Sequence, residues 1–153
     1  MLTLSVLENP GEGFAAQVGA AMSAAGNGVA VAVAVGGSGD VVIVSPGYRG
    51  RTPMGCAALL TPSVGRSDGR STMRQGVTYG MSPAAALTLS SIGDCTAMLA
   101  VQRELTTPLG AVVEEQELRI PLAEVGAEAD AAYATLAAAG ASIMLGLFPS
   151  GGT

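Results

Sequence analysis

The stretch of residues 46–81 most constrains the fold of this chain, because it has neither a helical nor a strand period. It is rich in glycine and proline and holds five of the seven arginines. Asp68 is its single acid, so the local charge is 5 − 1 = +4. Loops of this length inside a compact domain are uncommon and are usually functional or disordered. We therefore predict a single domain over residues 1–153 that carries a long Gly/Arg-rich loop at 46–81.

Before this loop, the hydrophobic pattern predicts one helix among three strands. Alternating apolar residues predict a strand at 2–6, and apolar residues at helical spacing predict a helix at 14–25. Valines alternate with alanines over 29–35, and a second apolar strand follows at 41–44. The glycine-rich segment 36–40 between these two strands favours a β-hairpin. A phosphate-binding loop would instead lead into a helix.

After the loop, the pattern predicts a second helix, a strand, and a final helix and strand. A Ser-Pro start and a mostly apolar sequence predict a helix over 82–103. Leu118, Ile120 and Leu122 alternate with Glu117 and Arg119, which predicts a strand with one exposed face over residues 112–122. A helical stripe over 125–140, ended by Gly140, leads to an apolar strand at 143–148.

This order of elements is β-α-β-β-long loop-α-β, followed by α-β. The first six elements match the split βαβ of ferredoxin-like folds, in which helices cover one face of an antiparallel sheet. We therefore predict an α+β fold of the ferredoxin-like type with an added C-terminal α-β unit.

The composition excludes several kinds of chemistry and of partner. The chain has no His and no Lys, which rules out His-based triads, His-ligated zinc and Schiff-base lysines. Its two cysteines do not form a Cys-x-x-Cys pair, so we expect no metal site and no cofactor. The net charge of −5 is the opposite of what a general nucleic-acid binder carries, so nucleic acid is not expected as the main partner.

The chain shows no membrane-spanning pattern, although its mean hydropathy is +0.48. Its longest apolar run, Val29–Val35, has seven residues, whereas a spanning helix needs about 20. The first residues lack the basic region of a signal peptide. We expect a cytoplasmic or particle-associated protein with no signal peptide, no transmembrane segment and no membrane partner.

Cys95 is the candidate catalytic residue. The local pattern runs Ser82-Pro83…Leu87…Ser91…Gly93…Cys95-Thr96-Ala97-Met98. It resembles the cysteine helix of the OsmC/Ohr thiol-peroxidase family. That resemblance implies an enzyme in which an arginine and an acid assist the Cys95 thiolate and a later cysteine resolves it, whereas here Cys56 precedes Cys95. The alternative role of Cys95 is that of a small buried hydrophobe on a core helix.

The arginines of the loop are candidates for a binding site or a subunit contact. Arginine binds carboxylates and phosphates through two N–H groups, and neighbouring glycines let backbone N–H groups approach an anion. The candidates are Tyr48, Arg49, Arg51, Arg66, Arg70 and Arg74. These residues allow three interpretations: contact with another subunit, binding of a small anion, or a solvated loop.

Residues 103–130 provide an acidic counterpart to this loop. They hold seven acids and two arginines, a local charge of 2 − 7 = −5. The predicted acidic partner surface comprises Glu114, Glu115, Glu117, Glu124 and Glu128. Opposite charges on two segments suit a head-to-tail contact between copies, and pairing within one chain is equally compatible. Glutamates on an exposed strand also discourage unwanted strand pairing.

These observations favour a non-enzymatic, self-associating structural protein, of the kind found in virions and other particles. Its Gly/Arg-rich loop would pack on the acidic surface of neighbouring subunits, giving a homo-oligomer or a larger assembly. The first alternative is a thiol-dependent enzyme that uses Cys95 with an arginine partner. The second is a small-anion-binding module that uses the arginine loop.

Overall fold

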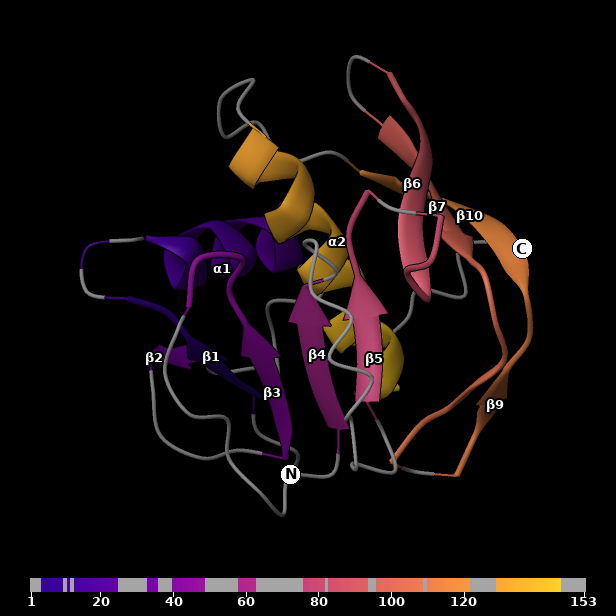
Figure 1. Cartoon of the computed structure of the whole chain (residues 1–153), viewed down its shortest axis with the longest axis horizontal. Coiled ribbons are helices and arrows are strands. Elements are labelled where there is room, and N and C mark those ends of the chain that lie inside the picture. The colour runs from indigo at the N-terminus through magenta and orange to yellow at the C-terminus, as the bar shows by residue number, and fades with distance from the viewer. Residues whose placement is uncertain are drawn as a thin grey trace.

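The computed structural model describes residues 4–9, 11, 13–24, 33–35, 40–48, 58–62, 76–81, 83–93, 96–108, 110–121 and 129–146. In this part of the chain, two helices lie on one face of a mixed eight-stranded sheet, and a two-stranded sheet lies beside it (Figure 1). This arrangement confirms the α+β class.

Five neighbouring strands run parallel. They are β1 (Leu4–Leu7), β2 (Val33–Val35), β3 (Val41–Val44), β4 (Ala58–Pro62) and β5 (Gly76–Tyr79), in the spatial order β2-β1-β3-β4-β5. Every residue of β1 and β3 is buried. Such continuous apolar strands are typical of parallel sheets, whose two faces are both covered.

Three antiparallel strands complete the sheet. They are β6 (Leu87–Ile92), β7 (Thr96–Val101) and β10 (Gln116–Pro121), and β10 is the outermost strand. A single parallel pair, Tyr79 with Leu87, joins them to β5. In β7, buried residues alternate with more exposed ones. This half of the sheet therefore has one core face and one solvated face.

The hairpin of β7 and β10 continues into the two-stranded sheet of β8 (Leu105–Thr106) and β9 (Val112–Val113). We call these four strands the β7–β10 ribbon. Val101 pairs with Gln116 and Leu105 with Val113, so residues 102–104 lie opposite residues 114–115. One extra residue on one strand is a β-bulge, which bends the ribbon at this point.

The first helix, α1 (Phe14–Ala24), packs against β1 and β2 and against the second helix beside it. Phe14, Val18 and Met22 are buried, which confirms the predicted helical stripe. Glu8 precedes the helix, and its carboxylate accepts hydrogen bonds from the N–H groups of Gly13 (3.0 Å) and Ala15 (2.5 Å) at the helix N-terminus. A carboxylate at a helix N-terminus satisfies backbone donors that have no partner within the helix.

The second helix, α2 (Ala129–Met144), crosses β3 to β6 and brings small residues against the sheet. A Cβ atom placed on Gly140 would lie 2.5 Å from Leu60 Cδ2 and 2.7 Å from Leu87 Cδ1, so only glycine fits there without rearrangement. The rings of Tyr133 on α2 and Tyr79 on β5 meet edge to face, with centroids 6.3 Å apart.

The opposite face of the parallel strands carries a second, smaller apolar cluster. Leu7, Val42, Val44 and Leu59 are all buried there, and the half-buried ring of Tyr48 packs against them. The parallel strands thus contribute apolar side chains to two layers, one facing the helices and one facing away from them.

The predicted hairpin of 29–35 and 41–44 is wrong. Both β2 and β3 pair with β1, one on each side and both in parallel. Because β1 is buried along its whole length, it can take the central position between two other apolar strands. The glycine-rich segment between β2 and β3 did not distinguish a hairpin from this arrangement.

The predicted helix over 82–103 is wrong as well, because this segment forms β6 and β7. Leu87 and Leu89 are buried and alternate with Thr88 and Ser90, which is a strand period. The turn between the strands is closed by a hydrogen bond from the N–H of Gly93 to the carbonyl of Thr96 (2.8 Å). The Ser-Pro start signal was local and did not outweigh this alternation.

Two further expectations need correction. Within 46–81, β4 and β5 are strands, and the remaining ranges 49–57 and 63–75 lie outside the described residues. The predicted strand at 143–148 is wrong over 143–146, because α2 continues to Met144. Gly146 follows the helix, and its φ of 73° is the left-handed conformation common after a helix C-terminus.

The ferredoxin-like topology is not confirmed. The eight strands follow the order β10-β7-β6-β5-β4-β3-β1-β2, with a parallel half that the prediction did not contain. The predicted strand over 112–122 is confirmed in β9 and β10.

Candidate functional site

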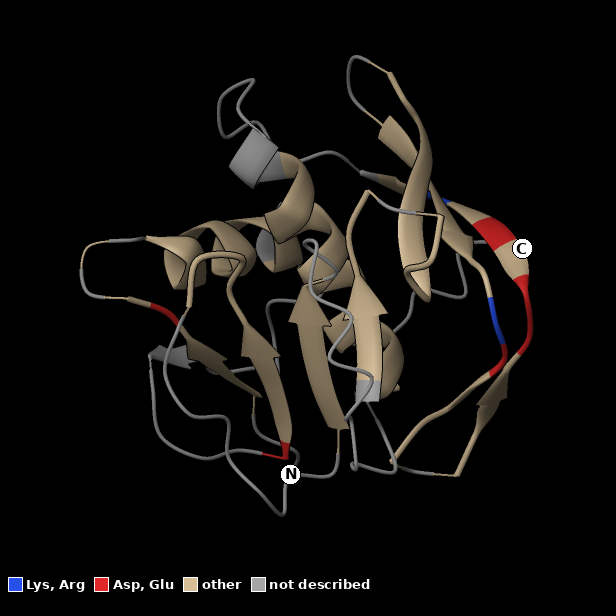
Figure 2. Cartoon of the chain, viewed as in Figure 1, with Lys and Arg blue, Asp and Glu red and all other residues tan. Residues whose placement is uncertain are grey.

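The charged residues gather at one end of the molecule. Among the charged side chains that the structure describes, all except Glu8 and Asp40 lie on the β7–β10 ribbon (Figure 2). They are Arg103, Glu104, Glu114, Glu115, Glu117 and Arg119, and every one is exposed. We call this set the charged edge, because β10 is the outermost strand of the sheet.

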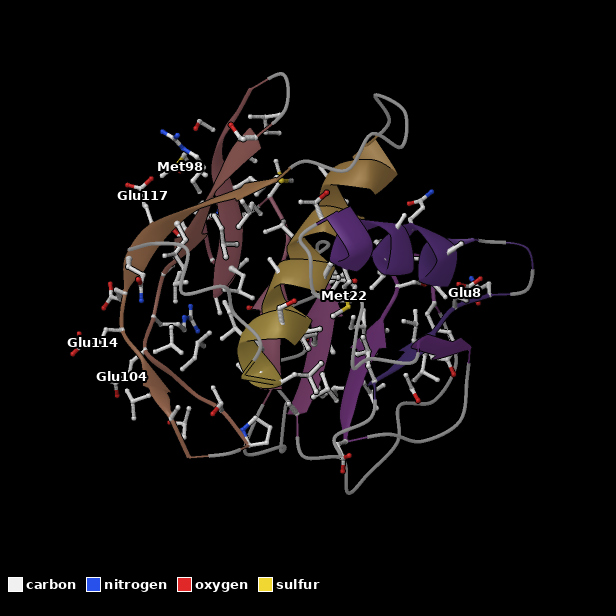
Figure 3. All side chains as sticks on the ribbon, turned by 180° about the vertical axis from the view of Figure 1, so that it is seen from behind. Glu8, Met22, Met98, Glu104, Glu114 and Glu117 are labelled. Atoms are coloured by element: carbon white, nitrogen blue, oxygen red, sulfur yellow. The ribbon has the colours of Figure 1, made fainter. Side chains whose placement is uncertain are left out.

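Three carboxylates of the charged edge lie at the bulge of the ribbon. Glu104 lies on one strand of the bulged hairpin, and Glu114 and Glu115 lie on the other. Figure 3 shows Glu104, Glu114 and Glu117 on the same outer side of the ribbon, far from Glu8 at the start of α1. Among the residues that the structure describes, no basic side chain forms an ion pair with Glu104, Glu114 or Glu115. These three carboxylates are exposed, and no described arginine neutralises them.

Two other groups of the charged edge, Arg103 and Glu117, have hydrogen-bond partners within the chain. Arg103 Nη2 donates to the carbonyl of Ala84 (3.0 Å), so its side chain holds the turn before β6. Glu117 Oε1 accepts a hydrogen bond from Ser90 Oγ (2.7 Å) on the solvated face of the sheet. A carboxylate has a second oxygen, so this bond leaves Glu117 able to accept from an arginine as well.

A second candidate region lies at the carboxyl ends of the parallel strands, and we call it the carboxyl edge. The N–H of Ser45 donates to the carbonyl of Leu7 (2.9 Å), and Asn9 Nδ2 donates to the carbonyl of Gly47 (2.6 Å). Tyr79 Oη donates to the carbonyl of Val44 (2.5 Å). These bonds connect the carboxyl ends of β1, β3 and β5 and the residues next to them.

The strand order reverses between β1 and β3, since β2 lies beyond β1 and β4 lies beyond β3. The order 2-1-3-4-5 is that of flavodoxin-type sheets, which bind ligands outside the carboxyl ends of the strands at this reversal. Here Glu8 already accepts the N–H groups of Gly13 and Ala15. The N-terminus of α1 is therefore occupied by the chain's own carboxylate instead of presenting these donors to a phosphate.

Several residues singled out from the sequence are placed by the structure. Tyr48 lies at the carboxyl edge and packs on the second apolar cluster. Glu114, Glu115 and Glu117 are exposed on the charged edge, and their role as a partner surface stays a prediction. The other candidates lie outside the described residues: Arg49, Arg51, Arg66, Arg70, Arg74, Cys95, Glu124 and Glu128.

The structure removes the helix on which the resemblance to thiol peroxidases was based. In the sequence, Cys95 follows β6 and precedes β7, and it lies outside the described residues itself. The flanking residues that the resemblance treats as helical are strand residues. The roles considered for Cys95 stay predictions.

Sequence reasoning missed the partners of the charged edge. The hydrogen bond between Ser90 and Glu117 joins strands that are separated by β7, and predicting a helix over Ser90 concealed it. The alternation of Leu87, Thr88, Leu89 and Ser90 was the signal that places Ser90 on a solvated strand face. Arg119 was counted only as a local charge.

Comparison of the sequence with models of known protein families and with curated proteins finds no match. No group of three or more Cys, Asp or Glu side chains in the described part of the chain is placed to hold a metal ion. Neither described helix is long and apolar enough to span a membrane.

Proposed function

We propose that this protein is a non-enzymatic, self-associating structural protein whose charged edge is the surface for contact with other copies. The observation that carries the proposal is the concentration of exposed carboxylates on the outermost part of the sheet, where Glu104, Glu114 and Glu115 have no ion-pair partner among the described residues. Exposed charges of one sign raise the rate and the specificity of association with a complementary surface.

The arginine-rich segments begin and end away from the charged edge, and a contact between copies is one way to bring the arginines onto it. These segments connect β3, β4 and β5, which lie three or more strand positions from β10. With strands about 4.8 Å apart, the anchor points are about 14 Å or more from the charged edge. A head-to-tail contact would bring the arginines of one copy onto the carboxylates of the next, and such contacts close into rings or grow into filaments.

Light scattering of the native protein across a salt series tests the proposal. We expect a discrete assembly well above the 15.0 kDa of one chain at low salt, and loss of that assembly as salt rises. Salt at about 0.1 M already screens exposed charges beyond about 10 Å. A 15.0 kDa species at every salt concentration and at high protein concentration contradicts the proposal.

Glu114→Gln with Glu115→Gln is the matching variant, because both side chains are exposed and make no bond that the fold needs. We expect this variant to lose mass at lower salt than the unaltered chain. Glu8→Gln is the control, since it removes a carboxylate charge at the opposite end of the molecule (Figure 3). The first variant loses two charges and the control loses one, so equal salt sensitivity of the two would contradict a role of the charged edge in association.

Binding of a small anion at the carboxyl edge is the second candidate function. The reversal of strand order between β1 and β3 favours this function, because ligands bind at such reversals in related sheets. Residues 45–48 also lie at this edge, and Arg49 and Arg51 come next in the sequence. Phosphate should then raise the melting temperature of the protein, and replacing Arg49 and Arg51 with Gln should abolish the rise. A rise that survives both replacements excludes these arginines as the site.

A further inference from the structure

We propose that two copies of this protein pair edge to edge through β10, antiparallel about a two-fold axis at Leu118, to form a sheet that is continuous across both copies. This inference deepens the proposed self-association by naming one interface. It requires no contact with segment 46–81, so it can fail while the proposed function stands. Its basis is the outer edge of β10, which pairs with β7 alone among the described strands.

The hydrogen-bond pattern fixes which backbone groups of β10 face outward. The N–H of Gln102 donates to the carbonyl of Ala86 (2.8 Å), and that of Gly93 donates to the carbonyl of Thr96 (2.8 Å). Even-numbered residues of β7 therefore direct their backbone groups to β6, and odd-numbered residues direct theirs to β10.

Leu99 pairs with Leu118, and Val101 pairs with Gln116. The backbone groups of residues 116 and 118 thus point to β7, and by alternation those of Glu117 and Arg119 point away from the sheet. These two residues present N–H and C=O groups that a further strand can pair with.

The side chains of the same two residues are complementary under a two-fold axis. When Leu118 lies opposite Leu118 of a second copy, Glu117 lies opposite Arg119, and Arg119 lies opposite Glu117. Both side chains are exposed, and they project on one face because they are two positions apart. Each interface then holds two cross-strand ion pairs, and the backbone bonds of residues 117 and 119 form between the same pairs.

The side chain on the other face of β10, opposite Glu117 and Arg119, is also compatible with this contact. Leu118 is only half-buried and packs against the edge of the main core. Opposite Leu118 of a second copy, it would gain an apolar neighbour. Pro121 has no N–H, so the end of β10 contributes fewer bonds, and residues 117 and 119 carry the pairing.

Other registers are disfavoured, which makes the contact specific. An axis at Glu117 would place two carboxylates opposite each other, and an axis at Arg119 would do the same with two guanidinium groups. A slip by one residue would bring the half-buried face of one copy beside the exposed face of the other. The same charges that disfavour pairing of two β10 strands in these registers favour pairing about a two-fold axis at Leu118.

Charge reversal at these two positions gives a sharp test. In Glu117→Arg the chain carries arginine at both positions, and in Arg119→Glu it carries glutamate at both. Each variant alone should therefore lose the dimer, with a dissociation constant raised about tenfold or more. A mixture of the two variants in equal amounts should form a heterodimer, because each arginine then faces a glutamate. The double variant, Glu117→Arg with Arg119→Glu, should recover the homodimer.

Native mass spectrometry at low ionic strength resolves these species, since the two variants differ in mass. Ser90→Ala is the control, because it removes the bond to Glu117 without changing a charge and should leave the dimer intact. Circular dichroism of each variant checks that the fold is kept. If both charge-reversed variants associate as the unaltered chain does, the β10 interface is overturned and the proposed function stands. The β10 interface is overturned together with the proposed function if the unaltered chain is a monomer under all conditions.

Discussion

The parallel and antiparallel halves of this sheet bury their residues differently, and the difference separates the body of the protein from its charged surface. In β3 of the parallel half, all four residues are buried. In β10 of the antiparallel half, Glu117 and Arg119 are exposed and only Ile120 is fully buried. Both faces of the parallel strands are apolar, whereas the antiparallel strands keep one face for solvent.

Charge placement follows from this difference. A charge buried without a partner is costly, so a strand with two covered faces has no position for it. The antiparallel half offers alternate exposed positions along β7 and β10, and the described arginines occur only there. The parallel half therefore supplies most of the stability, and the antiparallel half supplies the surface that we assign to association.

The largest difference between the halves is expected from truncation of a core leucine. Leu60 in β4 is fully buried, and Leu60→Ala should lower the free energy of unfolding by about 2–5 kcal/mol. Leu118→Ala in β10 removes the same atoms from a half-buried site, and should cost less than about 2 kcal/mol. Urea denaturation measures both. Equal losses at the two positions would contradict the division into a stabilising half and a surface half.

The next effect concerns two helical glycines. Gly140→Ala places a Cβ against Leu60 and Leu87 and should destabilise the protein by about 1–3 kcal/mol. Gly19→Ala on α1 meets nothing within 4 Å, so it should stabilise by about 0.5–1 kcal/mol through higher helix propensity. Thermal unfolding of both variants checks the opposite signs. A stabilised Gly140→Ala variant would mean that α2 does not approach the sheet this closely.

A smaller contrast is expected from two hydroxyl groups. Tyr79→Phe leaves the buried carbonyl of Val44 without its donor and should cost about 1–2 kcal/mol. Ser90→Ala removes an exposed bond to Glu117 and should change stability by less than about 0.5 kcal/mol. Chemical denaturation of the two variants side by side gives the comparison. If Ser90→Ala is the more costly change, the solvated face contributes more than we assign to it.

The smallest effect lies at the junction of β1 and α1. Glu8→Ala removes the carboxylate that accepts from Gly13 and Ala15, and should cost about 1 kcal/mol, as loss of a helix cap usually does. Glu8→Gln keeps an acceptor oxygen and should cost less. Melting temperatures of the two variants, with that of the unaltered chain, measure the order. An unchanged melting temperature in Glu8→Ala would show that water replaces the carboxylate without loss.

The sequence predicted the helices better than the sheet, for physical reasons. The stripe of Phe14, Val18 and Met22 needs only local spacing, and α1 forms where it was expected. Strand pairing depends on residues far apart in the chain: β1 takes β2 on one side and β3 on the other, which no local pattern specifies. Local signals also misled, since the Ser-Pro start suggested a helix where β6 forms.

The candidate site was predicted in part. The alternation of Glu117 and Arg119 with Leu118 and Ile120 predicted an exposed face, and the structure has Glu114, Glu115 and Glu117 exposed. The role of Arg119 opposite Glu117 in a second copy needed the outward direction of their backbone groups, which depends on the register of β10 with β7. Only tertiary structure supplies that register.

Amide hydrogen exchange followed by NMR at two protein concentrations tests the central claim, association through the outer edge of β10, most directly. The account predicts that the amides of Glu117 and Arg119 exchange more slowly as protein concentration rises, because their N–H groups become paired. The amides of Val42 and Ile43 in the parallel half should not change with concentration. Unchanged exchange at Glu117 and Arg119 while the native mass increases would contradict the account, since association would then use another surface.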